Sequence, residues 1–395
     1  MKQVSNGLMR LRSEKDLQEK FKGNVAYVCH GASVDEDIRH GVFTMKEIFG
    51  DRFIRIFSPQ HGFVGDVQDN MVESSHFMHP YFKIMVYSLY SETRIPTNEM
   101  LEGIDHIFVD MQDVGTRIYT YIYTMTLLME ACAKKGIEVI ILDRPNPING
   151  ETMEGNILDL NYASFVGRHP LPTRHGLTMV EVALMAQRYW GIDCKLTVIE
   201  MQGWERWMSY EDTQLTWVIP SPNLPTIDAA YTFVGTVLYE GTNISEGRGT
   251  TRSLETIGHP KIEAYSFADH LNPIFKKHNL EGFVIRPVVF LPTFQKHQGK
   301  ACGGYQIHVT DRTLFQPWKV CQILCQELYH HLGDEFQWKQ PPYEYEYNKM
   351  PVDLINGTDK LRLWVEHKGT FEELLEIEKE GQEEFKEMRK EILLY

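Results

Sequence analysis

The chain has 395 residues, of which 43% are hydrophobic and 24% are charged, as in an ordinary globular protein rather than a disordered one. A chain of this length is expected to form two subdomains. The net charge of −14 argues against nucleic acid or an anionic membrane as the partner, although a local group of arginines can still bind an anionic small ligand.

The cysteines and the N-terminal sequence indicate the cellular compartment in which the protein is expected. The six cysteines include no CxxC pair and no His/Cys cluster at zinc-ligand spacing, so we expect no metal site and reduced thiols, which fit a cytoplasmic protein. Residues 1–22 lack the apolar stretch of a signal peptide, and no run approaches the ~20 apolar residues of a membrane span. We therefore expect a cytoplasmic location, or an exported one if the chain is a processed form.

Short apolar runs alternate with amphipathic stretches in the first half of the chain. The apolar runs are rich in Val, Ile and Phe, as buried strands are, and lie at residues 24–29, 53–57, 84–87, 106–110, 138–142 and 195–200. Helical patterns lie at residues 43–49, 98–101, 118–135 and 179–190. This alternation predicts an α/β fold with a Rossmann-like, doubly wound parallel sheet.

The character of the sequence changes after residue 258. Strand patterns at residues 282–291 and 305–310 lie near helical patterns at 265–277 and 317–332, and residues 371–394 read as one charged amphipathic helix. We therefore predict an N-terminal domain over residues 1–258 and a smaller α+β domain over residues 259–395.

Polar residues follow four of the predicted strands. They are His30, the pair Gln60 and His61, the segment from Asp110 to Asp113, and residues 143–147. Functional groups of a parallel sheet gather where its strands end, so these residues predict a site at one edge of the sheet. No GxGxxG or GxxxxGK[ST] motif follows any of these strands, so nucleotide binding lacks its phosphate-binding loop.

The Gly-rich stretch 239–250 holds the densest polar chemistry in the chain. It contains Glu240, Asn243, Glu246, Arg248 and three glycines between apolar segments. Glycine lets the backbone approach a ligand closely, although a turn capped by its own side chains is an equally simple explanation.

Several carboxylates could serve glycoside cleavage. That reaction generally needs a proton donor at the leaving oxygen and, at the anomeric carbon, either a second carboxylate or an acetamido group of the substrate. Glu240 and Glu246, with Asp110 and Asp113, could supply the pair. Asp113 could instead cap the helix that follows it.

Other polar residues are candidates for binding. Arg144 lies on a turn made rigid by two prolines, where it could bind a carboxylate or pair internally with Asp143. Asn223, also between prolines, could bind sugar hydroxyls or close an Asx-turn. Thr178 and Glu181 have the spacing of a capping box, which we take as structural. Candidate sugar platforms are Tyr87, Tyr90, Tyr119, Tyr121 and Trp217.

Taken together, these segments resemble the exo-β-N-acetylmuramidases of the NamZ type, long known only as a domain of unknown function. The matching stretches follow the family's order and are residues 58–65, 87–90, 110–121, 143–147, 164–167, 174–178, 220–225 and 240–250. The resemblance implies a Rossmann-like subdomain and a smaller C-terminal one with the active cleft between them. It also implies hydrolysis of terminal N-acetylmuramic acid from the non-reducing end of peptidoglycan fragments, with no metal or organic cofactor.

The resemblance also suggests roles for individual residues. We expect Glu240 to be the general acid/base and Asp110 or Asp113 to orient the substrate, whose lactyl carboxylate would require an arginine. The full set of catalytic candidates is Glu240, Asp110, Asp113, His61 and Gln60. The substrate-binding candidates are Arg117, Arg144, Asn146, Arg174, His175, Asn223, Asn243 and Arg248. The expected ligand is a small saccharide or muropeptide, and the sequence leaves the oligomeric state open.

One position departs from the resemblance. The family usually has glutamate where this chain has Gln60, which can hydrogen-bond a glycosidic oxygen but cannot protonate it. A non-catalytic muropeptide-binding protein is therefore the alternative to a hydrolase. A nucleotide or nucleotide-sugar enzyme is a third, weaker hypothesis.

Overall fold

A seven-stranded sheet forms the centre of the N-terminal part in the computed structural model, which describes residues 3–66, 68–69 and 71–395. Its strands lie in the order β3-β4-β2-β1-β5-β6-β9, and every pair is parallel except β3 with β4. The bounds are β1 Val25–Cys29, β2 Phe53–Ser58, β3 Phe77–Met78, β4 Met85–Ser88, β5 His106–Asp110, β6 Glu138–Leu142 and β9 Leu196–Ile199. This confirms the predicted doubly wound α/β fold.

The predicted strands are continuous apolar runs because helices cover both faces of the sheet. Val25 and Tyr27 of β1 pack in one hydrophobic cluster with the helices α1 and α3, whereas Ala26 and Val28 pack in the other with α4 and α5. The bounds of the helices in this part are α1 Gly7–Ser13, α2 Lys15–Gln18, α3 Gly41–Phe49, α4 Tyr121–Lys135 and α5 Met179–Tyr189.

The order of the strands fixes where a site can form. The chain runs outward from β1 through β2 to β4, then returns to β5 on the other side of β1, where Cys29 pairs with Asp110. The carboxyl ends of β1 and β5 therefore flank the point at which the winding reverses, which is the usual ligand site of such sheets. The predicted polar segments follow these strand ends.

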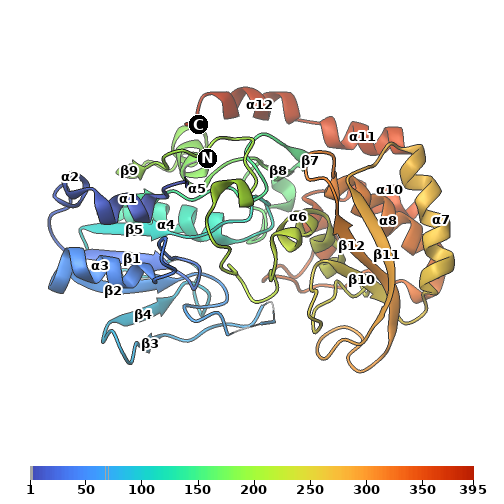
Figure 1. The fold of residues 1–395 in the computed structure, drawn as a ribbon, viewed down its shortest axis with the longest axis horizontal. Coiled ribbons are helices and arrows are strands. Elements are labelled where there is room, and N and C mark those ends of the chain that lie inside the picture. The colour runs from blue at the N-terminus through green and yellow to red at the C-terminus, as the bar shows by residue number, and fades with distance from the viewer. Residues whose placement is uncertain (1–2, 67, 70) are drawn as a thin grey trace.

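The C-terminal part is built on a three-stranded antiparallel sheet of order β10-β12-β11. Figure 1 shows this sheet on the right and the parallel sheet on the left. Its elements are α6 Ile227–Thr236, β10 Thr256–His259, α7 Ala264–Lys277, β11 Phe283–Phe290, β12 Cys302–Val309, α8 Pro317–Leu332, α9 Pro351–Asn356, α10 Lys360–Glu366, α11 Phe371–Lys379 and α12 Gln382–Lys390. A hairpin of β7 Glu154–Ile157 and β8 Pro172–Arg174 and the 3-10 segments Gly50–Arg52, Leu160–Tyr162, Glu211–Thr213, Val237–Gly241 and Gly333–Glu335 complete the fold.

Two predicted helices are corrected by the structure. Residues 98–101 form a succession of turns rather than a helix, and Gly103 follows with a positive φ of 73°. The predicted helix over residues 371–394 is two helices, α11 and α12, because Gly381 between them has a positive φ of 76°. Glycine takes that conformation without strain and ends one helical run before the next begins.

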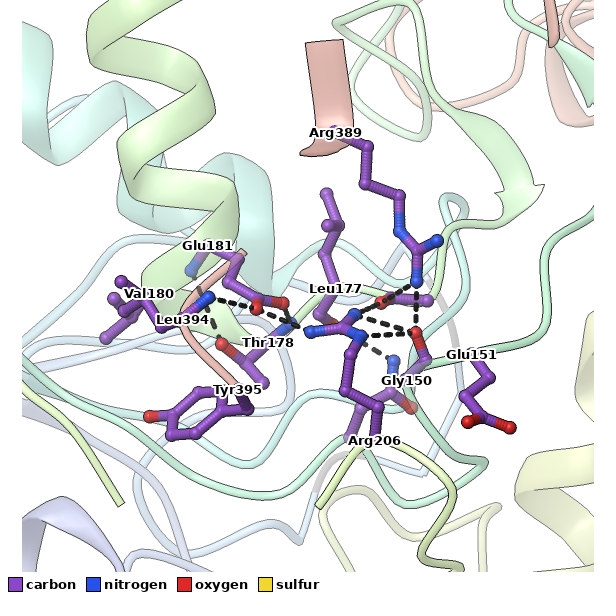
Figure 2. Close-up of polar contacts among 12 residues, drawn as sticks. Gly150, Glu151, Leu177, Thr178, Val180, Glu181, Arg206, Arg389, Leu394 and Tyr395 are labelled. Carbon is purple, nitrogen blue, oxygen red and sulfur yellow. Dashed lines mark hydrogen bonds and ion pairs between the residues drawn. The ribbon is translucent and has the colours of Figure 1, made fainter. Parts of the chain in front are cut away.

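The C-terminal helices return to the N-terminal part. Figure 1 shows α11 and α12 running across the top of the molecule toward α5. The guanidinium groups of Arg206 and Arg389 both donate to the carbonyl oxygen of Gly150, as Figure 2 shows. Glu181 closes the predicted capping box with Thr178 and also accepts hydrogen bonds from Arg206 and the Leu394 backbone. The end of the chain is therefore part of the N-terminal fold.

Arg117 is a second link between the two parts. Its side chain is fully buried and donates to four backbone carbonyl oxygens, those of Asn156 and Leu171 at 2.9 Å each, Ile355 at 3.1 Å and Asn356 at 2.7 Å. Buried carbonyl groups require such donors, so Arg117 fastens the β7–β8 hairpin to the end of α9.

No helix within the described residues is long and apolar enough to cross a membrane. All six cysteines are buried and free.

Replacing Arg117 with Met keeps the length of the side chain but removes a donor from four buried carbonyl groups. Those of Leu171 and Asn356 keep one other donor each, the Leu158 N–H and the Asn156 Nδ2, whereas those of Asn156 and Ile355 lose their side-chain donor. We expect the free energy of unfolding to fall by about 3 kcal/mol, measured by urea denaturation. The exposed Arg188, which pairs with Glu391, provides the control, and Arg188→Met should change it by less than about 0.5 kcal/mol. An Arg117→Met protein as stable as the wild type would contradict the linking role.

Candidate active site

A cavity lies where the carboxyl edge of the parallel sheet faces the C-terminal part. Its polar lining comes from the segments after β2 and β5, from the Pro-rich turn, from the Gly-rich stretch and from a turn near residue 344. The lining residues are Gln60, His61, Ile118, Tyr119, Thr120, Tyr121, Val166, Ser221, Asn223, Leu224, Phe233, Val237, Glu240, Arg248, Leu254, Tyr343 and Glu344. The cavity therefore brings together segments that are far apart in the sequence.

Glu240 is one of two carboxylates in the lining. It lies in the 3-10 segment Val237–Gly241, where one carboxylate oxygen accepts a hydrogen bond from Arg248 and the other accepts one from the Tyr343 hydroxyl at 2.8 Å. Both oxygens thus face donors, and the Arg248 bond is charge-assisted.

Arg248 joins Glu240 to a second buried carboxylate, Glu246, to which its Nε donates at 2.9 Å. Lys296 donates to the other oxygen of Glu246 at 2.7 Å and to the carbonyl oxygens of Tyr239 and Ile244. Burial acts to raise the pKa of Glu246, but the charges of Lys296 and Arg248 outweigh it and lower that pKa. Glu246 is therefore an ionised member of the network that holds Arg248 and, through it, Glu240.

Glu344 is the other carboxylate in the lining, and its surroundings differ from those of Glu240. It is buried, and the Tyr90 hydroxyl lies 3.0 and 2.9 Å from its two oxygens. Burial raises the pKa of Glu344 to about 7 and the negative charge of Glu240 raises it as well, against the effects of Tyr90, Arg94 and Gln60. Near neutral pH this carboxyl group can therefore carry a proton.

The turn that presents Glu344 is tight and strained. Tyr343 and Glu346 exchange two backbone hydrogen bonds of 3.0 and 2.9 Å, and the two residues between them, Glu344 and Tyr345, have positive φ angles of 44° and 66°. Two-residue turns of this kind favour Asn and Gly, so Glu and Tyr cost free energy here. Strain of this sort is commonly found at functional sites, where the surrounding structure maintains it.

Gln60 and His61, both predicted for the site, line the cavity. The Oε1 atom of Gln60 accepts a hydrogen bond from Thr120 at 2.7 Å, and the Gln60 side chain also hydrogen-bonds Glu344. Gln60 therefore orients the Glu344 carboxyl group. His61 has a positive φ of 69° directly after Gln60, which turns the chain at the edge of the sheet.

Asn223 offers a hydrogen-bonding group to a ligand. Its Nδ2 donates to the carbonyl oxygen of Gln68 at 2.6 Å, whereas its buried Oδ1 has no partner among the described residues. The side chain therefore does not close an Asx-turn, which was one of the two roles expected for Asn223 from the sequence. Tyr121, also in the lining, donates its hydroxyl to Pro220 at 2.8 Å, and His30 contacts the same carbonyl oxygen at 3.1 Å, so the Pro-rich turn is firmly held.

The two aspartates predicted for the site lie outside the lining. Asp110 is fully buried and accepts two hydrogen bonds from Arg144, at 2.5 and 3.0 Å, and one from Tyr27. Asp113 accepts from the Gly115 backbone at 2.7 Å and lies 3.6 Å from the Nε2 atom of His175. The partner of Arg144 is thus Asp110 rather than Asp143, which instead accepts from Tyr395.

Other predicted binding residues also have structural partners. Arg117 is bound by four carbonyl groups, Arg174 is fully buried and donates to the Ile148 carbonyl oxygen, and Asn146 bridges Leu177 and Ile148. Asn243 pairs with the backbone of Glu335 and Gln337 and borders a neighbouring cavity. Of the four predicted arginines, Arg248 is the one in the active-site lining.

Sequence reasoning missed Glu344 and Tyr343. Residues 341–347 read Pro-Pro-Tyr-Glu-Tyr-Glu-Tyr, and this run of aromatic and acidic residues after two prolines was a usable signal for an ordered turn. In the described part of the chain, no group of three or more His, Cys, Asp or Glu side chains could hold a metal ion.

Comparison with known proteins identifies the family to which this fold belongs. The chain is similar along its whole length to two DUF1343 family proteins from Bacteroides fragilis NCTC 9343, each 28% identical, with TM-scores of 0.86 and 0.76; 100% of this chain and 99% of each of those chains is covered. Models of the N-terminal and C-terminal parts of the exo-β-N-acetylmuramidase NamZ match residues 25–228 and 231–395. The chain belongs to the NamZ family.

A curated relative supports the same assignment. The peptidoglycan β-N-acetylmuramidase NamZ of Bacillus subtilis strain 168 is 37% identical over 381 residues, which cover 96% of this chain and 89% of that protein. The two family models meet between residues 228 and 231, upstream of the division that the sequence predicts near residue 258.

Replacing Glu344 with Gln removes a carboxyl group whose folded-state pKa of about 7 lies above the ordinary value of 4.5. A raised carboxyl pKa means that the wild type loses stability as the pH rises from about 4.5 to about 7, by up to about 3 kcal/mol. We expect the difference in Tm, variant minus wild type, to become more positive between pH 5 and pH 8. The control Glu346→Gln, two residues along the chain, should show no such trend, and a pH-independent difference for Glu344→Gln would contradict the raised pKa.

Proposed function

We propose that this chain is an exo-acting β-N-acetylmuramidase. It hydrolyses the glycosidic bond that joins the terminal N-acetylmuramic acid to the non-reducing end of peptidoglycan fragments. Membership of the NamZ family supports the reaction. The observation that carries the mechanism is the presence of two carboxylates in one cavity with opposite surroundings, Glu240 against a guanidinium group and Glu344 buried beside a tyrosine. Paired carboxyl groups in unlike environments are the usual arrangement for general acid catalysis by glycosidases.

In the proposed reaction Glu344 is the proton donor. Its proton moves to the glycosidic oxygen as the bond from that oxygen to the anomeric carbon breaks, and the leaving saccharide departs as an alcohol. Glu240 is the second carboxylate and stabilises the positive charge that develops at the anomeric carbon. Water then supplies the hydroxyl group of the released sugar and returns a proton to Glu344.

The remaining groups in the lining fit the terminal sugar. Asn223 offers a hydroxyl or acetamido N–H group an amide oxygen that no described residue engages, and the aromatic residues Tyr119 and Tyr121 supply apolar surface. Arg248 lines the cavity and is the arginine that we expect to bind the lactyl carboxylate. Glu240 and Glu246 already neutralise much of its charge. Gln60 does not need to be acidic in this scheme, because its role is to orient Glu344.

The ligand that we propose is therefore a peptidoglycan-derived saccharide or muropeptide. We also propose a cytoplasmic location, which six buried and free cysteines support.

The Glu344→Gln variant should keep the fold and the hydrogen bond to Tyr90 but cannot donate a proton. We expect kcat on a saccharide substrate, whose leaving group is an alcohol, to fall by roughly two to four orders of magnitude, measured by release of N-acetylmuramic acid. The loss on 4-nitrophenyl β-N-acetylmuramic acid should be much smaller, because 4-nitrophenolate leaves without needing a proton. The Glu346→Gln control should keep wild-type turnover. Undiminished activity of Glu344→Gln would remove Glu344 from the role of proton donor.

A Gln60→Glu variant places a second carboxyl group in contact with Glu344. Two adjacent carboxyl groups resist ionising together, so the alkaline fall of kcat/KM should move to higher pH by about one unit. The maximal activity should stay within about tenfold of the wild type. An inactive wild type that becomes active through Gln60→Glu would instead place the proton donor at position 60 and favour a binding function for the natural chain.

A further inference from the structure

Arg94 lies in the segment that follows β4, close to the active-site cavity but outside its lining, and its side chain is only 14% exposed. The Cζ atom of its guanidinium group lies 3.9 Å from the ring centre of Tyr90 and 4.5 Å from that of Tyr345. The ring centre of Phe165 is 5.6 Å away. A cation over an aromatic face is attracted to the ring, most strongly where water is excluded. Arg94 therefore contacts one tyrosine from each part of the chain.

Both tyrosines are next to the proposed proton donor. The Tyr90 hydroxyl hydrogen-bonds the Glu344 carboxyl group, and Tyr345 is the residue that follows Glu344 in the chain. By contacting the two rings, the Arg94 guanidinium group holds the hydrogen-bond donor of the carboxyl group and the turn that presents it.

The turn that carries Glu344 needs support from outside itself. The positive φ angles of Glu344 and Tyr345 persist only where the surrounding structure imposes them. Part of this support comes from the N-terminal part: the Tyr345 hydroxyl donates to Glu73 at 2.5 Å, and the Glu344 backbone N–H contacts the Sδ atom of Met71 at 3.5 Å. Arg94 adds its contact with the Tyr345 ring and lies 3.7 Å from Glu73.

Arg94 also has donors and charge that its neighbours leave free. Its Nη1 atom donates to the carbonyl oxygen of Ser91, whereas its Nε and Nη2 atoms are buried and have no hydrogen-bond partner among the described residues. The nearby Glu73 is 45% exposed, so solvent weakens its hold on the guanidinium charge. The positive charge of Arg94 is therefore available to act on a neighbouring carboxyl group.

The charges around Glu344 have opposite effects on it. Glu240 raises the pKa of Glu344, whereas the positive charge of Arg94 and the hydrogen bond from Tyr90 lower it. When Glu344 gives up its proton, a carboxylate remains, and a nearby positive charge stabilises it. The titratable and charged residues around this carboxyl group are Tyr90, Arg94, Glu240, Tyr343 and Tyr345.

We propose that Arg94 is a positioning residue for the proton donor. It holds the Glu344 turn through the two tyrosine rings and supplies the positive charge that stabilises the carboxylate left when the proton moves to the glycosidic oxygen. The inference rests on the proposed function, because the proposed reaction defines the proton donor. Arg94 acts through Glu344 and lies outside the cavity lining, so it should affect kcat rather than KM.

The test replaces Arg94 with Met, which removes the charge and the planar group. On a saccharide substrate, we expect kcat for release of N-acetylmuramic acid to fall roughly tenfold or more, because a misplaced donor transfers its proton less readily. KM should stay within about twofold of the wild type. The loss on 4-nitrophenyl β-N-acetylmuramic acid should be much smaller, because that leaving group needs no proton.

Arg39→Met is the matched control. Arg39 also stacks on an aromatic ring, 4.7 Å from the ring centre of Phe43, and pairs with a glutamate, Glu47, but it does not line the active-site cavity. This variant should match the wild type on both substrates.

The pH dependence separates the charge of Arg94 from its stacking. Without the positive charge Glu344 keeps its proton to higher pH, so the alkaline fall of kcat on the saccharide should move up by about half a unit to one unit in Arg94→Met. Arg94→Lys keeps the charge but has no planar group to stack on the rings. It should lower kcat without moving the alkaline fall.

Two results would overturn the proposal. One is an equal loss on the two substrates in Arg94→Met, which would mean a general effect on the fold, and the other is an alkaline fall that stays in place. Should Arg94→Met fail to fold, as judged by its Tm, Arg94→Gln keeps a planar group beside the rings and removes the charge. The same upward movement is expected from it, and no movement would contradict the proposal.

Failure of the proposed function gives a different result. A wild type that cleaves neither substrate refutes the hydrolase. The role of Arg94 is then tested on the carboxyl group itself, by infrared difference spectroscopy of Arg94→Met with and without Glu344→Gln. A Glu344 titration midpoint above that of the wild type would retain Arg94 as its charge partner, and an unchanged midpoint would refute it.

Discussion

Arg248 lies buried between Glu240 and Glu246, and the active site depends on this arrangement. The guanidinium group donates to one oxygen of each carboxylate, and Lys296 pairs with the other oxygen of Glu246. Removing one partner of such a buried network would leave an uncompensated charge, which is far more costly than any surface pair. The network therefore fixes the position of Glu240 in the lining of the cavity.

The charge on Glu240 in turn shapes the behaviour of Glu344. Burial is the main cause of the raised pKa of Glu344, which is about 7, and the like charge of Glu240 raises that pKa further. Tyr90 and Gln60 hold the carboxyl group in place through hydrogen bonds. The site thus places one carboxyl group, Glu240, against a guanidinium group and buries the other, Glu344, whose pKa is raised. A glutamine at position 60 is compatible with this arrangement, because the proposed proton donor is Glu344.

Much of the fold could be predicted from the sequence, because strands and helix caps are determined by residues that are close together in the chain. Strands such as β5 and β6 are buried on both faces, so they appear as unbroken apolar runs with the bounds that the structure shows. The capping box of Thr178 and Glu181 was equally visible, because its two residues are three apart. The break at Gly381 was missed because the amphipathic pattern continues through it, and a single glycine is a weak signal inside a charged helix.

The site was harder to predict because its parts are far apart in sequence. The edge of the sheet indicated Gln60 and His61, and the Gly-rich stretch indicated Glu240 and Arg248, all of which line the cavity. Nothing in the spacing of Asp110 or Arg144 reveals that they bind each other in the core. Glu344 comes from a turn 104 residues after Glu240, and only the packing of the C-terminal part against the sheet brings the two together.

Infrared difference spectroscopy between the wild type and Glu344→Gln can follow the titration of the Glu344 carboxyl group directly, and this titration decides whether Glu344 is the proton donor. We expect a protonated carboxyl band that persists to about pH 7 in the wild type and is absent from the variant. A Glu344 carboxyl group that is already fully ionised at pH 5 would contradict its assignment as the proton donor.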